Sequence, residues 1–202
     1  DLLGTTSFDS DRISSAWQDS DAKVWCGNFY NNSFSTAEQA AVLATTKSDD
    51  AHTSSSTPTE HFVASENILN GDKVFFLSAW EVENSVYGFI DNDARISTDH
   101  WWLRSPSEQV GDWNGAGSVI FNGTVVADNL NTQSGARPAF NLDTNSVLFT
   151  SAAQGGKSAS GMDTGLAAVS DYDGSEWKLT LLDSSRSFDV AETSSSGNPG
   201  GT

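Results

Sequence analysis

The chain has few basic residues, few histidines and a single cysteine, and each shortage argues against a class of function. Its 202 residues include ten Lys or Arg against 27 Asp or Glu, a net charge of -17. Such a charge repels phosphate backbones and anionic membranes, so we expect no nucleic-acid partner. Cys26 alone cannot form an internal disulfide. The histidines, His52, His61 and His100, are far apart in sequence with no cysteine or histidine at metal-ligand spacing, which argues against a zinc site.

Long apolar runs are also missing. No run approaches the roughly 18 residues of a membrane-spanning helix, so we expect no membrane insertion. The first residues look like the middle of a domain, so any signal peptide would lie upstream or have been removed. Seven Trp, eleven Phe and three Tyr are ample for one core. We therefore predict one domain over 1–192, then a linker tail over 193–202, as a monomer within a larger multidomain chain.

Motifs for catalysis are scarce. The segment 153–158 resembles the end of a phosphate-binding loop, but Ser151 occupies the position of its first glycine and no helix start follows. A Gly-x-Ser-x-Gly nucleophile motif is absent. We predict a protein that is not an enzyme. Because carboxylates are plentiful, a glycoside hydrolase is the alternative.

We predict no cofactor and no metal site. Asp91 and Asp93 flank Asn92 and supply oxygen atoms of the kind that bind calcium, but the spaced Gly and Glu of an EF-hand loop are missing. Calcium at Asp91 and Asp93 is therefore kept only as an alternative.

The pattern of apolar residues and helix caps predicts an α+β fold. Ser35 with Glu38, and Ser78 with Glu81, form capping boxes that predict helix starts. The predicted helices span 21–30, 36–45 and 79–85. Residues 1–11 are predicted to be an edge strand or an ordered lead-in. The other predicted strands are a buried strand over 73–77, a hairpin of 118–121 and 124–127, strands over 136–142 and 146–150, and a hairpin over 176–191 appended to the same domain. Asn122-Gly123 fits a type I′ turn, and 46–61 and 151–165 are predicted to be loops.

Two motifs, each combining aromatic residues with an arginine and a proline, enclose a polar middle. WWLRSP covers 101–106 and ARPAF covers 136–140, whereas the residues between are mostly Gly, Asn, Ser, Asp and Thr. We expect Trp101, Trp102, Arg104 and Arg137 to be structural anchors, with the arginines bonded to loop carbonyls or carboxylates. The expected buried residues are Trp25, Phe76, Leu77, Trp101, Trp102, Leu103 and Phe140.

These two motifs resemble an uncharacterised domain family of secreted and surface proteins from gut-dwelling Gram-positive bacteria. Supporting pieces are Trp17, Trp25-Cys26, the 29–35 segment and the 72–78 segment. The Trp-rich core is also similar to C-type lectin-like and formylglycine-generating-enzyme-like folds, some of whose members are variable proteins diversified by retroelements. The resemblance implies a C-type lectin-like domain with short helices, a twisted antiparallel sheet and long loops, located outside the cell or at its surface.

The resemblance does not carry catalysis over. Formylglycine-generating enzymes need paired reactive cysteines, and Cys26 is alone. In the lectin-like superfamily the long loops before the last strands carry binding, which would correspond to 105–134 here.

We predict that these loops bind a host or microbial surface glycan or protein, as an adhesin would. Polar side chains orient a ligand and an exposed Trp supplies contact area. The candidate ligand-binding residues are Glu108, Asp112, Trp113, Asn114, Asn129 and Asn131. The alternative for Trp113 is a place in the core, and a structural stalk module is the alternative for the whole domain.

Overall fold

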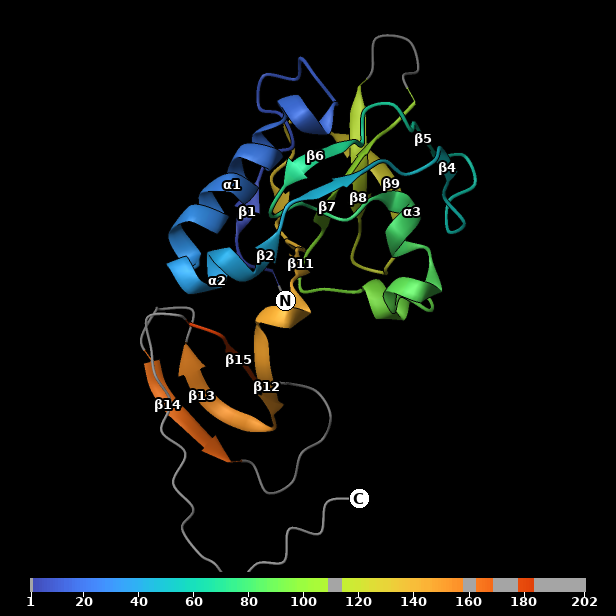
Figure 1. Ribbon diagram of the computed structural model, residues 1–202. Helices are drawn as coiled ribbons and strands as arrows, with labels where there is room; N and C mark the ends of the chain where they lie inside the picture. Colours follow the sequence, from blue (N-terminus) through green and yellow to red (C-terminus); the bar gives the residue numbers. More distant parts are fainter. Residues whose placement is uncertain (1, 109–113, 158–162, 169–177, 184–202) are drawn as a thin grey trace, which may run out of the picture.

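In the computed structural model, the described residues are 2–108, 114–157, 163–168 and 178–183. They form short helices and mainly antiparallel sheets, which confirms the predicted α+β class (Figure 1). The strands β12 to β15 lie together at one end of the molecule, beyond β11 (Figure 1).

The three α-helices begin where their caps predict. Helix α1 spans Asp21–Ser33, and the Ser20 side chain accepts a hydrogen bond from the Lys23 amide. Helices α2 (Thr36–Ala41) and α3 (Ala79–Val82) both begin with a complete capping box. Both helices are shorter than predicted. Helix α2 ends because the next residues form strand β2 (Val42–Leu43), which pairs with β11 (Asn141–Leu142). The short 3-10 helices are η1 (Trp17–Asp19), η2 (Ser85–Tyr87), η3 (Asp93–Arg95) and η4 (Thr144–Ser146).

The main sheet has five strands in the order β1-β10-β7-β8-β9. Their bounds are Thr5–Thr6 (β1), Ser134–Gly135 (β10), Trp101–Pro106 (β7), Gly115–Val119 (β8) and Val125–Asn129 (β9). All neighbours are antiparallel except β10 and β7, which share one parallel pair, Gly135 with Trp101. The predicted edge strand within 1–11 is therefore β1. The predicted strand over 136–142 is only β11, with the short β10 before it.

The hairpin of β8 and β9 is where the sequence predicts it, but its turn differs. The Gly123 amide donates to the Ile120 carbonyl, and the Ile120 amide donates to the Thr124 carbonyl. Gly123 has φ +76°, whereas Asn122 does not have a positive φ. The predicted type I′ turn is therefore wrong, because the connection is a longer loop with glycine in the left-handed position.

Besides β2 with β11, the described residues form four more two-stranded sheets. They are β3 (Thr45–Lys47) with β6 (Leu69–Asp72), β4 (His52–Thr53) with β5 (His61–Phe62), β12 (Val147–Ser151) with β15 (Lys178–Leu181), and β13 (Ala153–Lys157) with β14 (Asp163–Ala168).

The remaining strands confirm one further prediction and correct three. Strand β12 confirms the one predicted over 146–150. The loops predicted over 46–61 and 151–165 are wrong in part. The first contains β4, and the second contains β13 and the start of β14. The predicted strand over 73–77 is also wrong: this buried segment has a single bridge, Phe75 with Ala139, and its Phe76 and Leu77 carbonyls accept from Arg104 instead. The second half of the hairpin over 176–191 lies outside the described residues.

Two clusters of buried apolar side chains form the core, and all their members lie between residues 2 and 139. The first contains Trp17, Phe76 and Trp102, and the second contains Trp101 and Leu103. The predicted burial of Phe76, Trp101, Trp102 and Leu103 is confirmed, since none is exposed.

Three other expected core residues are less buried. Trp25 and Leu77 are half-buried and pack against the clusters. Phe140 is 42% exposed, so its predicted burial is wrong. Its neighbour Ala139 pairs with Phe75 through the backbone, which leaves Phe140 at the edge of the core, packed on Phe34 at 5.4 Å between ring centroids.

Arg104 is the anchor that the sequence predicts. Its side chain is fully buried and donates to the Asn67 carbonyl at 3.0 Å and the Phe76 carbonyl at 2.9 Å. It also forms ion pairs with Asp49 and Glu81, which are both buried. Lys47 bonds the same two carboxylates at 2.8 Å and 2.5 Å. This cluster of two cations and two carboxylates therefore ties β7 to β3 and α3.

The Lys47 ammonium is held in its charged form. Burial acts to lower its pKa, but hydrogen bonds to Asp49, Glu81 and Tyr87 outweigh burial and raise the pKa. The ammonium also lies 5.4 Å from the Trp80 ring and 5.0 Å from the Tyr87 ring.

Arg137 behaves differently from the prediction. Its guanidinium stacks 4.8 Å from the Trp101 ring and 5.5 Å from the Phe89 ring, and its buried Nη1 has no hydrogen-bond partner. Burial lowers the pKa of Arg137. The expected bond from Arg137 to a carbonyl or carboxylate is therefore wrong for Nη1, and its contact with the core is mainly a cation–π one.

Candidate functional site

A short backbone ladder at the end of β7 organises the candidate site. Phe62 and Ser107 form an antiparallel bridge, the Val63 amide donates to the Pro106 carbonyl at 3.1 Å, and the Glu108 amide donates to the His61 carbonyl at 2.7 Å. The 61–63 segment is thereby fixed to the strand that Arg104 anchors. Ser107 and Glu108, which are neighbours at the end of this ladder, line two different hollows.

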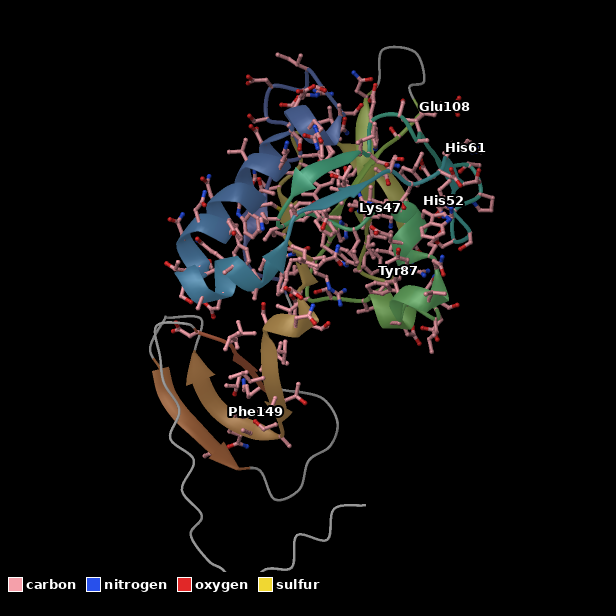
Figure 2. All side chains as sticks on the ribbon, viewed as in Figure 1. Lys47, His52, His61, Tyr87, Glu108 and Phe149 are labelled. Carbon is pink, nitrogen blue, oxygen red and sulfur yellow. The ribbon has the colours of Figure 1, made fainter. Side chains whose placement is uncertain are left out.

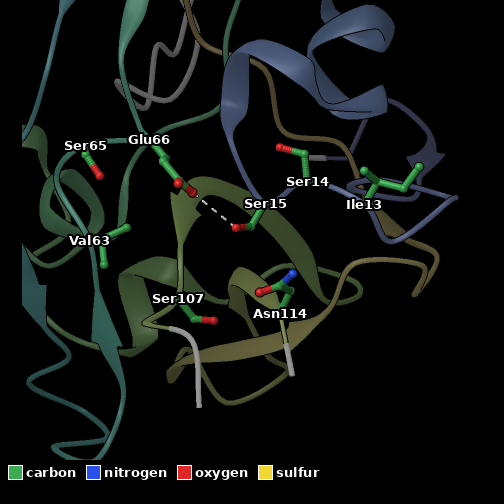
Figure 3. Close-up of a pocket in the computed structure, with 8 residues that line it drawn as sticks. All are labelled: Ile13, Ser14, Ser15, Val63, Ser65, Glu66, Ser107 and Asn114. Atoms are coloured by element: carbon green, nitrogen blue, oxygen red, sulfur yellow. Dashed lines mark hydrogen bonds between the residues drawn. The ribbon is translucent and has the colours of Figure 1, made fainter. Parts of the chain in front are cut away.

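The first surface is a polar hollow of about 270 Å³, which we call the serine hollow (Figure 3). Its lining residues are Ile13, Ser14, Ser15, Val63, Ser65, Glu66, Ser107 and Asn114. Within it the Ser15 hydroxyl donates to the Glu66 carboxylate at 3.3 Å. The Ser107 hydroxyl donates to the Gly115 carbonyl at 3.1 Å, so it is held at the base of β8. The hollow thus presents hydroxyl, amide and carboxylate groups from three separate segments.

Local hydrogen bonds hold the 9–16 wall of the serine hollow in place. The Asp9 carboxylate accepts from the Ile13 amide at 2.7 Å and the Ser14 amide at 2.8 Å. Arg12 has φ +58°, in the left-handed region that non-glycine residues seldom adopt. Its guanidinium donates to the Asn129 side chain at 3.3 Å, which joins this wall to β9. The wall is therefore shaped before any ligand arrives.

The second surface, the histidine hollow, has a volume of about 250 Å³. It is lined by Ala51, His52, Thr53, His61, Phe62, Val63 and Glu108. Figure 2 shows that Glu108, His61 and His52 follow one another along the side formed by β4 and β5. The Thr53 hydroxyl and His61 Nδ1 are 2.9 Å apart. Since Val63 lines both hollows, the two are immediate neighbours.

His52, which lines the histidine hollow, contacts Glu83, whose side chain is 1% exposed. His52 Nε2 lies 2.8 Å from this carboxylate, and the amides of Ser55 and Ser56 donate to it at 2.7 Å and 3.2 Å. Burial acts to raise the Glu83 pKa, but the bonds from His52, Ser55 and Ser56 outweigh burial and lower it to about 2. Glu83 therefore fixes the 54–57 loop as a carboxylate, in a structural role.

The predicted ligand-binding residues are only partly brought together. Asn114 lines the serine hollow and Glu108 lines the histidine hollow. Asn129 lies beside them, because it pairs with Gly115 across β8 and β9. Asn131 is exposed just beyond β9. Asp112 and Trp113 lie outside the described residues, so the two hollows are defined without them.

Sequence reasoning missed two of the three segments that line the serine hollow. The 13–15 segment gives only the signal of a polar run, and 63–66 follows a loop with no motif. Both segments are far from Asn114 in sequence, so the sequence does not indicate that they line the same hollow. The one available signal is Asp9, four and five residues before the amides that it caps, which is typical of a carboxylate that orders a loop.

Asp91, one of the two residues proposed as the calcium alternative, has an internal role. The Asp91 carboxylate accepts from the Ala94 amide at 2.9 Å and so stabilises the start of η3. Among the described residues no group of three or more His, Cys, Asp or Glu side chains is arranged to hold a metal ion.

The fold and these two hollows define an α+β domain with an open polar surface at one end of its main sheet. The model of the family described as a domain of unknown function, DUF6273, matches residues 2–144, and the chain belongs to this family. That match ends close to the last core residue. No curated protein and no solved structure matches the chain significantly. In the described part of the chain, no helix has the length and apolar character needed to cross a bilayer.

Proposed function

We propose that the chain is a non-enzymatic, extracellular or cell-surface binding domain of C-type lectin-like architecture, which recognises a glycan or protein through the loops between 105 and 134. The observation that carries the proposal is the position of Asn114 and Glu108. They flank the 109–113 segment and line two adjacent hollows whose walls are fixed by β7, β8 and the ladder at 61–63.

A rigid support under polar, accessible side chains is the arrangement expected of a binding surface. Buried Arg104 holds β7 through four partners, and the Asp9 carboxylate holds the opposite wall. Ser14, Ser15 and Asn114 are then presented at small entropic cost, because their backbone is already ordered. The proposed surface includes the 13–15 and 63–66 segments in addition to 105–134.

The proposal is tested by probing glycan and protein arrays with the full chain, followed by affinity measurements on variants. Asn114→Ala should weaken binding of an array ligand by about 1 kcal/mol or more, with the melting temperature nearly unchanged. Asn145→Ala, which lies in η4 beyond the family match, is the matched control and should bind as wild type. If no ligand is bound, the domain is a stalk module. Turnover of a glycan that one carboxylate substitution abolishes would instead show a glycoside hydrolase.

A further inference from the structure

We infer that the two hollows together select a cationic ligand, a segment of a partner protein that places one basic side chain in each hollow. This inference rests on the proposed function, since it names the ligand class of the same surface. The serine hollow contains the Glu66 carboxylate and the histidine hollow contains the Glu108 carboxylate. No lysine or arginine is among the described residues that line either hollow.

Glu66 and Glu108 differ from the carboxylates that are paired with internal cations, and they differ from other exposed carboxylates, such as Asp91 and Asp93, in that each lines a hollow. Asp49 and Glu81 are paired with Arg104 and Lys47, and Asp72 lies 3.7 Å from the Lys23 ammonium. In contrast, no ion pair within the described part of the chain includes Glu66 or Glu108. Glu66 accepts a hydrogen bond from Ser15 but has no cationic partner among the residues that the structure describes, so both carboxylates in the hollows can pair with an external cation.

The groups around Glu66 suit an ammonium or guanidinium better than an anion or a metal ion. Four serine hydroxyls and the Asn114 amide oxygen can accept hydrogen bonds from its N–H groups. A single carboxylate in each hollow falls short of the several oxygen ligands with which proteins usually hold calcium. The net charge of -17 adds long-range attraction for a basic partner.

The size of the hollows points to two side chains on one ligand. Volumes of about 270 and 250 Å³ lie below the roughly 300 to 1,000 Å³ of sites for drug-sized molecules, so each hollow takes one small group. Val63 lines both hollows, and a peptide crossing it would reach both. Linking the two weak contacts raises the affinity through effective concentration.

The test uses synthetic peptides with two lysines separated by one to four Gly or Ser residues, titrated into the full chain by calorimetry. Peptides in which glutamine replaces both lysines, and neutral and sialylated oligosaccharides, are the comparison ligands. The dilysine peptides should bind, the glutamine peptides should not, and raising the salt concentration from about 20 to about 300 mM should weaken binding at least five-fold, because screening weakens exposed ion pairs.

Variants then assign the two hollows. Glu66→Gln and Glu108→Gln should each weaken dilysine binding about two- to five-fold, the loss expected for one exposed ion pair. Asp93→Asn, which removes an exposed charge at the far end of the β8–β9 hairpin, should have no effect beyond that of net charge. Oligosaccharide binding that is insensitive to salt and to Glu66→Gln would overturn the cationic inference while leaving the proposed function intact. Binding that none of the loop variants, including Asn114→Ala, affects would overturn both.

Discussion

Replacing Arg104 by methionine should destabilise the domain by about 3–5 kcal/mol, the usual cost of removing one partner from a buried ion pair. The substitution keeps most of the side-chain volume but removes the donors to the Asn67 and Phe76 carbonyls and the pairs with Asp49 and Glu81. Lys47 remains beside both carboxylates, but one ammonium cannot neutralise two charges that are each 3% exposed.

The assay is urea unfolding followed by tryptophan fluorescence, with Lys47→Met as the matched control. Lys47 contacts the same carboxylates, but its side chain is 28% exposed, so its loss should cost only about 1–2 kcal/mol. In a double-mutant cycle, Glu81→Gln should cost at least about 1 kcal/mol less when Arg104 is already methionine. Glutamine preserves the capping box, so the cycle reports the ion pair. An Arg104→Met cost below about 1 kcal/mol, or no coupling, would refute the assignment of Arg104 as the main anchor of β7.

Two further predictions rest on particular contacts, and a third rests on the sequence prediction for Trp113. Gly123→Ala should destabilise the domain by about 2 kcal/mol or more in urea unfolding, because at φ +76° a Cβ would lie 1.8 Å from the Asn92 carbonyl oxygen. Gly88→Ala is the control: Gly88 has φ +88° but open space around it, so the substitution should cost only about 1–2 kcal/mol. Equal costs for the two variants would contradict this packing. Because folding lowers the Glu83 pKa from its ordinary 4.5 to about 2, this carboxylate gives its full stabilisation above pH 4.5 and loses it as the pH falls towards 2. Glu83→Gln should therefore remove about 3 kcal/mol at pH 7 and flatten the stability profile between these pH values, and an unchanged profile would contradict it. Trp113→Ala should weaken ligand binding by roughly 2 kcal/mol or more without lowering the melting temperature; unfolding of the variant would instead make Trp113 a core residue.

Local signals in the sequence were enough to find the helix starts and the buried anchor residues of β7, although they did not predict the strand itself. The capping boxes at Ser35 and Ser78 depend on residues three positions apart, so they are readable without a fold. Trp101, Trp102 and Leu103 are buried in β7, as the sequence predicts. Helix ends were less predictable: α2 stops at Ala41 because Leu43 pairs with Asn141, a residue about a hundred positions away.

Only part of the candidate site could be predicted, because the other part depends on contacts between residues that are distant in sequence. Asn114 and Glu108 stand in a polar stretch beside a strong motif, which drew attention to them. Their neighbours in the hollows come from segments around Ser15 and His61, and only the tertiary fold brings these together. The partners of Arg104 were equally hidden, since Asp49 precedes it by 55 residues.

The most direct test of the binding surface is hydrogen–deuterium exchange with and without a saturating array ligand. The account predicts that ligand-dependent protection concentrates in 12–15, 61–66 and 105–116, and that Asn114→Ala reduces it at matched ligand concentration. Protection confined to β12 and β15, or to the segment between η2 and η3, would place the ligand elsewhere and contradict the assignment of the binding surface to the two hollows.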